Sequence, residues 1–263
     1  MCIRDSLYAW YQFDTDVSSA GSLPDKSGNS RDLTPADSDA NRPQAPTSDA
    51  PFLTTKSPAG FPNKSAQFSN DLLEFDDPSG TDDFSFGSAS SNSDSPFSVS
   101  VWFKASGAQS TIESTSQYMV AKYKSDTSDR EWLLWLNNGR PQIFLSNDGG
   151  TSAYVLNTHN DTVQSNEWSH VLFTYDGNES NPHVVIYLNG KVDKVGAGTF
   201  SYNGMTGEKS GHFSIGNQNN ESSSFDFVGS FAEVAVWSTA LGPGEVETLY
   251  RSREGLYKSR SGY

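Results

Sequence analysis

The residues of this sequence that could do chemistry are mainly aromatic rings, amides and carboxylates. Aromatic residues make up 13% of the 263-residue chain. Sugars stack on flat aromatic faces, while Asn, Asp and Gln side chains bind their hydroxyl groups. Trp132 and Trp135 are three residues apart, so one strand would point them to opposite faces. One of them, with Tyr123, Tyr154 or Tyr187, is expected to line a concave ligand-binding face. We take Trp132, Tyr123 and Tyr154 as candidates, with core packing as the alternative role of each ring.

Several other chemistries are not supported by the residue patterns. The four histidines show neither i, i+4 spacing nor companion cysteines, and Cys2 is the single cysteine, so we do not expect a transition-metal site. The sequence contains no G-x-S-x-G, phosphate-binding-loop or dinucleotide-binding motif. A formal net charge of -14 would repel nucleic acids and anionic membranes, and no run of 18 apolar residues could span a bilayer. We therefore expect neither nucleic-acid partners nor membrane insertion.

The elements that must position these residues are short strands joined by tight turns. Residues 184–188 alternate in period 2, and Asn189-Gly190 follows. Both residues tolerate positive φ, so this pair predicts a type I′ hairpin. A second β-rich run over 168–175 ends at the turn cluster Asp176-Gly177-Asn178, which makes an antiparallel meander. Other strands are predicted over 7–13, 64–68, 72–75, 97–104, 119–123, 132–136, 141–145, 153–156, 213–216 and 227–237.

Many short strands closed by turn residues predict an all-β fold, a two-sheet antiparallel β-sandwich. One short helix is predicted over 245–251, because Pro243 suits a first helical turn and apolar residues follow at i, i+3 and i+4. The proline-rich stretch 35–62 and the Ser- and Asp-rich stretch 76–96 are predicted to be long surface loops, since proline disrupts strand pairing.

The order of motifs resembles the laminin G-like, concanavalin A-like lectin/glucanase jelly-roll domains. This likeness covers residues 7–250 and implies a jelly roll with the ligand face described above; it also implies that His170 packs inside the sandwich. More loosely, the chain resembles modules on structural proteins of marine bacteriophages. The segments that carry the resemblance are WYQFD (10–14), DKSGN (25–29), KSAQF (64–68), FSVSVWFK (97–104), EWLLWLNNGRPQIFL (131–145), EWSHVLFTYDG (167–177), VVIYLNGK (184–191), HFSIGNQ (212–218) and FVGSFAEVAVWSTAL (227–241).

The resemblance also defines what an enzyme of this kind would carry, which is an E-x-D-x-E or E-x-D-x-x-E string on one strand. Alternation places such carboxylates on one face, flanking the glycosidic bond. The nearest string here begins Glu74-Phe75-Asp76, but its third position is Pro78 or Ser79. We therefore expect no catalytic residues, with a glycoside hydrolase or lyase of the same fold as the alternative.

Calcium is the cofactor that the resemblance leaves open. Calcium takes carboxylate, amide and carbonyl oxygens from loops. Asp25, Ser27 and Asn29 form a turn that resembles the calcium-binding turn of related domains. The usual second carboxylate of those domains is replaced by Ala232, and Glu233 or Asp14 would have to substitute. A plain Asx turn is the alternative interpretation.

The sequence-based hypothesis is a non-catalytic carbohydrate-binding or cell-surface adhesion module of a larger virion or surface protein. Its expected partners are a glycan or cell-surface polysaccharide and other structural proteins of a particle; a purely structural, decorating domain is the second alternative. We expect an extracellular or virion-surface location, although no signal peptide is visible. Residues 1–6 are interpreted as a foreign leader, 7–250 as the domain, and 251–263 as a truncated tail.

Overall fold

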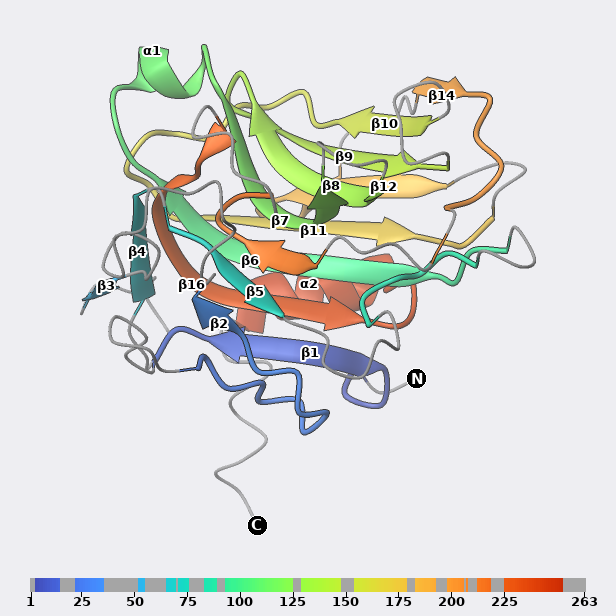
Figure 1. Cartoon of the computed structure of the whole chain (residues 1–263). Coiled ribbons are helices and arrows are strands. Elements are labelled where there is room, and N and C mark those ends of the chain that lie inside the picture. Colours follow the sequence, from blue (N-terminus) through green and yellow to red (C-terminus); the bar gives the residue numbers. More distant parts are fainter. Residues whose placement is uncertain are drawn as a thin grey trace.

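The protein is a β-sandwich in which two antiparallel sheets lie face to face in the computed structural model (Figure 1). The structure describes residues 3–14, 22–35, 52–54, 65–69, 71–75, 83–88, 93–124, 129–147, 154–178, 183–192, 198–205, 207, 212–218 and 225–252. Among these, no helix is long and apolar enough to cross a membrane. The predicted all-β sandwich with a short C-terminal helix is confirmed.

The first sheet is built around two long central strands, β6 and β16. Its order is β13 (Lys191–Val192), β12 (Val184–Leu188), β11 (Ser169–Tyr175), β6 (Phe97–Ala105), β16 (Val228–Trp237), β4 (Ser65–Ser69) and β3 (Phe52–Thr54). The strand β1 (Leu7–Gln12) also pairs with β16, so β4 and β1 divide one edge of that strand.

The second sheet runs in the order β14 (Gly198–Phe200), β10 (Tyr154–Thr158), β9 (Arg140–Ser146), β8 (Asp129–Asn137), β7 (Ser116–Lys124), β15 (Phe213–Ile215), β5 (Leu73–Phe75) and β2 (Thr34–Pro35). Two helices complete the described elements, α1 (Gln109–Ile112) and α2 (Pro243–Ser252).

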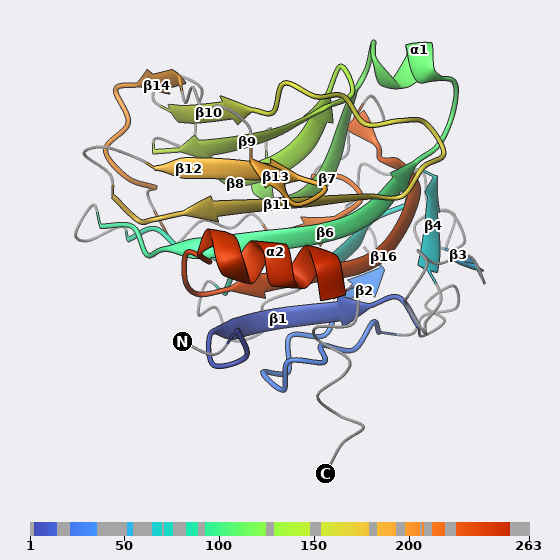
Figure 2. The same cartoon turned by 180° about the vertical axis from the view of Figure 1, so that it is seen from behind.

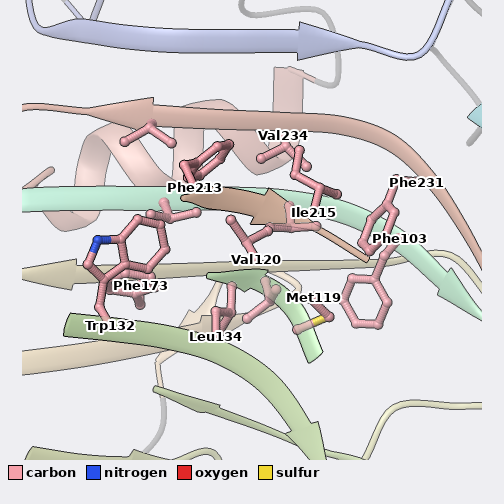
Figure 3. Packing of buried hydrophobic residues seen from close by; sticks show 14 of the residues in the cluster. Phe103, Met119, Val120, Trp132, Leu134, Phe173, Phe213, Ile215, Phe231 and Val234 are labelled. Atoms are coloured by element: carbon pink, nitrogen blue, oxygen red, sulfur yellow. The ribbon is translucent and has the colours of Figure 1, made fainter. Parts of the chain in front are cut away.

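The core lies between the sheets and takes alternate residues from each strand. On β6, Val99, Val101 and Phe103 point into this layer, because successive side chains of a strand face opposite ways. Trp132 and Phe173 join them from opposite sheets, with ring centroids 6.3 Å apart. Figure 3 shows how the aromatic and aliphatic side chains of the two sheets interdigitate in this layer.

The outer face of the first sheet is covered by α2, which lies across β6 and β16 (Figure 2). The predicted helix is therefore confirmed, with its start at Pro243 and the side chain of Glu245 accepting a 2.8 Å hydrogen bond from the amide of Gly242. A second apolar cluster fills the space under this helix. It consists of Trp10, Leu172, Val185, Tyr187, Ala235, Trp237, Leu241, Val246 and Leu249.

Four elements differ from the sequence-based expectation, and two of them, β2 and β14, are short strands outside the predicted strand ranges. The proline-rich stretch 35–62, predicted to be loop, contains β3, which pairs with β4 at the edge of the first sheet. Pro35, the first residue of this stretch, ends β2 at the edge of the second sheet, a position that tolerates proline. The helix α1 was not predicted, because four residues make a single turn and carry no recognisable apolar period.

The structure describes most of the predicted leader but little of the predicted tail. Residues 3–6 of the predicted leader lie against β16, where the indole N–H of Trp237 donates a 2.8 Å hydrogen bond to the carbonyl of Ile3. The amide of Ser238 donates a 2.9 Å hydrogen bond to the carbonyl of Ser6. Most of the predicted tail, 253–263, lies outside the described residues.

Two hairpins of the sandwich use the same Asn-Gly turn. Asn189 and Gly190 have φ angles of 51° and 73°, and Asn138 and Gly139 have 51° and 74°. The predicted positive-φ turn at 189–190 is confirmed. A methyl group added at Gly190 would lie 2.6 Å from the ring of Tyr250 on α2, whereas one at Gly139 would meet nothing nearer than 3.4 Å.

We therefore expect Gly190→Ala to cost about 1 kcal/mol more stability than Gly139→Ala, since both changes strain a left-handed residue but only the first displaces Tyr250. Denaturant titration of the two variants measures this difference. The difference should disappear when both changes are made in a Tyr250→Ala background. Equal costs in the parent background would show that α2 does not rest on the hairpin.

Candidate functional site

A group of aromatic side chains lies on the outer face of the second sheet, away from the core. Its members are Tyr118 and Tyr123 of β7, Trp135 of β8 and Phe144 of β9, which we call the aromatic platform. The ring of Tyr118 lies 6.0 Å from that of Trp135, and Trp135 lies 6.2 Å from Phe144. Tyr118 and Trp135 are only partly buried, so their rings reach the surface.

The platform is positioned by the pairing of β7 with β8. Tyr118 is the direct partner of Trp135 in this ladder, so their side chains stand on the same face. A register shift between Tyr118 and Val120, where Met119 is the extra residue of β7, brings Tyr123 to that face. The ring of Phe225, from a distant connection, stacks on Tyr118 at 4.7 Å with an interplanar angle of 5°.

The electrostatics of the platform keep its hydroxyl groups neutral. Burial raises the pKa of Tyr118 to about 12, and the neighbouring Tyr123 adds to the rise. Burial likewise raises the pKa of Tyr123, while the guanidinium of Arg130, 5.7 Å from its ring centre, opposes the rise. Neutral phenols both donate and accept hydrogen bonds, as sugar hydroxyls require.

The structure replaces Trp132 by Trp135 as the candidate ligand-binding tryptophan. Trp132, taken as a candidate, is completely buried between the sheets and cannot touch a ligand. Its partner in the alternation, Trp135, occupies the outer face. Tyr123 is on the platform, and Tyr187 lies under α2. Tyr154 begins β10, and its side chain lies outside the part that the structure describes.

Glu74 is the one carboxylate of the candidate acidic string that the structure describes. Glu74 of β5 lies with one carboxylate oxygen 3.5 Å from Nδ1 of His212. Its predicted companions, residues 76–79, lie outside the described residues. Within the described part of the chain, no three His, Cys, Asp or Glu side chains group so as to hold a metal ion.

The predicted calcium turn is a compact hydrogen-bonded loop. The carboxylate of Asp25 accepts hydrogen bonds from the amides of Trp10, Ser27 and Arg31 and from the hydroxyl of Ser27, at 2.7–3.2 Å. Asn29 donates its side-chain N–H to the hydroxyl of Ser27 at 3.0 Å. Each carboxylate oxygen thus already serves two protein donors, which is the alternative Asx-turn interpretation.

The fourth predicted calcium ligand, Glu233, is held elsewhere. Its carboxylate accepts a 3.0 Å hydrogen bond from the indole of Trp10, whose ring belongs to the cluster under α2. The strand β1 lies between the two places, since Tyr11 pairs with Val234 on one side and with Asp25 on the other. The four predicted ligands do not form one site in this geometry.

One further polar pair is enclosed in the domain. His170 is completely buried under α2, and its Nε2 lies 2.8 Å from the hydroxyl of Ser100. The rings of Trp102 and Tyr250 stack against it at 4.9 and 5.9 Å. A histidine closed off in this way cannot serve a substrate, although it titrates with consequences for stability.

Two packed antiparallel sheets with a covering helix and an aromatic outer face define a lectin-like β-sandwich. Residues 78–247 match the family described as the concanavalin A-like lectin/glucanases superfamily, and the chain belongs to this family. A search of the curated proteins found no match.

Several solved structures share this fold. The binding domain of Paraclostridial mosquitocidal protein 1 is 14% identical, with a TM-score of 0.64 over 95% of this chain and 53% of that one. Domain 4 of a GH43 extracellular arabinanase from Geobacillus stearothermophilus, solved with arabinotriose, is 19% identical, with a TM-score of 0.61 over 93% and 98%. The ligand-binding domain of botulinum neurotoxin serotype D, solved with N-acetylneuraminic acid, is 14% identical, with a TM-score of 0.58 over 95% and 52%.

The coverage of these structures is uneven. The chain spans about half the length of the two toxin domains and nearly all of the arabinanase domain. At such identities the likeness concerns the fold.

Proposed function

We propose that the chain is a non-catalytic carbohydrate-binding module and that the aromatic platform holds the sugar. The observation that carries this proposal is the pair of partly exposed rings, Tyr118 and Trp135, that lie beside the buried rings of Tyr123 and Phe144 on one face of a rigid sheet. Flat rings contact the apolar C–H face of a sugar, and the neutral hydroxyls of Tyr118 and Tyr123 bind its oxygens. Strands hold such side chains more rigidly than loops would, which lowers the entropy that binding must overcome.

Two structures with a similar fold support the proposed carbohydrate-binding function. The arabinanase domain was solved with arabinotriose, and the neurotoxin domain with N-acetylneuraminic acid. The neurotoxin domain is described as a ligand-binding domain, and the arabinanase domain as the fourth domain of that enzyme. A binding role for the present chain is thus compatible with the use of this fold in those proteins.

A glycoside hydrolase or lyase of the same fold is the competing function. Reducing-sugar release across a panel of polysaccharides separates the two. Turnover that is lost in Glu74→Gln would replace the binding hypothesis, because Glu74 is the described member of the candidate acidic string. Substrate binding without turnover supports the non-catalytic module.

The proposed setting is extracellular or on a particle surface, within a larger protein. Surface binding of this kind is weak at one site and gains strength from repetition. The net charge of -14 keeps the domain away from anionic polymers in such a setting. Calcium at the Asp25 turn stays a prediction, which melting curves in chelator and in millimolar calcium test. A multimerised domain that binds no glycan or host surface would favour the purely structural role.

We expect Trp135→Ala to weaken polysaccharide binding by about tenfold or more, because it removes the ring at the centre of the platform. Binding is measured with a multimerised domain on immobilised polysaccharides. The matched control is Trp168→Ala, which removes another partly buried tryptophan that lies 5.4 Å from the ammonium of Lys104, away from the platform. Equal losses in the two variants would contradict the proposed face.

A further inference from the structure

A concave site lies at the hairpin between β12 and β13, apart from the platform. It is a pocket of about 360 Å³ lined by Asp161, Thr162, Gln164, Leu188, Asn189 and Lys191. This volume is near the lower end of small-molecule sites, which run from roughly 300 to 1,000 Å³. One wall belongs to the connection that precedes β11, and the other belongs to the hairpin.

Both walls of the pocket are anchored to the body of the domain. His159 is buried, with only 2% of its surface exposed. Its Nδ1 accepts a 3.1 Å hydrogen bond from the amide of Asp161, and its Nε2 lies 3.4 Å from the carbonyl of Lys191. Val163 is buried, and its amide donates to the carbonyl of Gly139 at 2.8 Å. The pocket is therefore held open in one shape before any ligand arrives.

The hairpin wall is fixed by a different contact. The side-chain oxygen of Asn189 accepts a 2.9 Å hydrogen bond from the amide of His170. This contact orients the amide group and leaves its N–H groups for another acceptor, because the oxygen is the atom in use. Leu188, which is 5% exposed, supplies an apolar floor.

The remaining polar side chains of the pocket are not engaged within the protein. Among the described residues, the side chains of Asp161, Thr162, Gln164 and Lys191 form no hydrogen bond or ion pair. Free donors and acceptors thus surround an apolar floor. The carboxylate would repel an anionic ligand and the ammonium a cationic one, whereas a neutral polyol can donate to Asp161 and accept from Lys191.

We propose that this pocket binds one neutral sugar residue at the end of a glycan chain. A pocket of this size encloses a terminal residue, while the flat platform suits an internal stretch. The choice of a sugar as the ligand rests on the proposed carbohydrate-binding function. The site itself is independent of the platform, since its residues come from the first sheet and the connection before it.

The test uses the whole chain labelled with nitrogen-15 and methyl glycosides of neutral pentoses and hexoses at millimolar concentration. We expect amide shifts at 161–164 and 188–191, and an affinity at least about tenfold lower in Asp161→Ala and in Lys191→Met. Glu167→Ala and Arg140→Met are the matched controls, since both remove exposed charges outside the pocket. Unshifted pocket amides with every glycoside, or unchanged affinity in both variants, would overturn the site.

These experiments can refute the pocket and the platform independently of each other. Pocket shifts that persist in Trp135→Ala support the further site whatever happens at the platform. Polysaccharide binding that depends on Trp135 while no glycoside moves the pocket amides would refute the pocket and leave the proposed function standing. Binding that depends on Lys191 and not on Trp135 would support the pocket and remove the platform.

Discussion

Acidification from pH 7 to pH 4 should lower the free energy of unfolding by about 3 kcal/mol through His170 alone. Burial lowers the pKa of His170 to about 3 in the folded protein. In an unfolded chain the pKa of histidine is about 6.5, so between these values the unfolded state binds a proton that the folded state excludes. Stability is therefore full above about pH 6.5, falls as the pH drops, and stops falling near pH 3.

The surroundings of the ring explain why the neutral form is favoured. Nε2 has the hydroxyl of Ser100 at 2.8 Å, but Nδ1 has no hydrogen-bond partner within the described part of the chain. Imidazolium carries two N–H donors, and only one acceptor is at hand. The flanking rings of Trp102 and Tyr250 also exclude water, which would otherwise stabilise the charge.

The double variant His170→Phe with Ser100→Ala isolates this contribution. Phenylalanine keeps the stack with Trp102 and Tyr250, and alanine removes a hydroxyl that would lose its partner. Denaturant titrations at pH 7 and pH 4 should show that the variant loses about 3 kcal/mol less than the parent between the two conditions. His183→Gln is the control, because it removes an exposed histidine and keeps His170 and Ser100 in place. Parallel losses in parent and double variant would show that the acid sensitivity arises elsewhere.

Local signals predicted the parts of the fold that short-range chemistry determines. The Asn-Gly pair at 189–190 requires positive φ at both residues, and the structure has it. The helix near the C-terminus was visible because Val246, Leu249 and Tyr250 share one face. The alternation of β6 and β11 likewise divides their residues into two faces, and the structure shows that one of these faces enters the core.

The candidate site could be predicted only in part, since alternation gives relative and not absolute direction. It separates Trp132 from Trp135, but the sequence does not say which of the two faces the opposite sheet. The register shift at Met119 in β7 also places Tyr118 and Tyr123 on one face, although strict alternation would point residues five positions apart to opposite faces. Phe225 reaches Tyr118 from a distant connection, and no local pattern announces this contact.

His170 is a second residue whose burial, but not its face of the sheet, could be predicted from the sequence. The family resemblance implied a position inside the sandwich, and the ring is indeed completely buried. It is buried under α2, however, on the outer face of the first sheet, because its neighbours Val171 and Phe173 point into the core. Burial follows from the strand pattern only when the position of the covering helix is known. Glu233 is a similar case, since β1 separates it from the Asp25 turn.

Trp132→Ala should cost about 3–5 kcal/mol of stability, which is a large part of the roughly 5–15 kcal/mol that is usual for a folded protein. The side chain is fully buried, and its indole N–H donates a 2.9 Å hydrogen bond to the carbonyl of Phe84. The rings of Phe97 and Phe213 lie 5.5 and 5.9 Å away and would line the resulting cavity. Trp132→Phe should cost less, because it keeps a ring there and loses the hydrogen bond.

Comparison of Trp132→Ala with Trp135→Ala tests which face of β8 packs against the core. Trp135→Ala should cost only about 1 kcal/mol, since its ring already meets solvent on one side. Thermal and denaturant unfolding of the two alanine variants therefore should differ by at least about 2 kcal/mol, while sugar binding should fail in Trp135→Ala with the fold intact. An equal or reversed order of stability would mean that β8 presents its other face to the core, and the platform would then have to be rebuilt around Trp132.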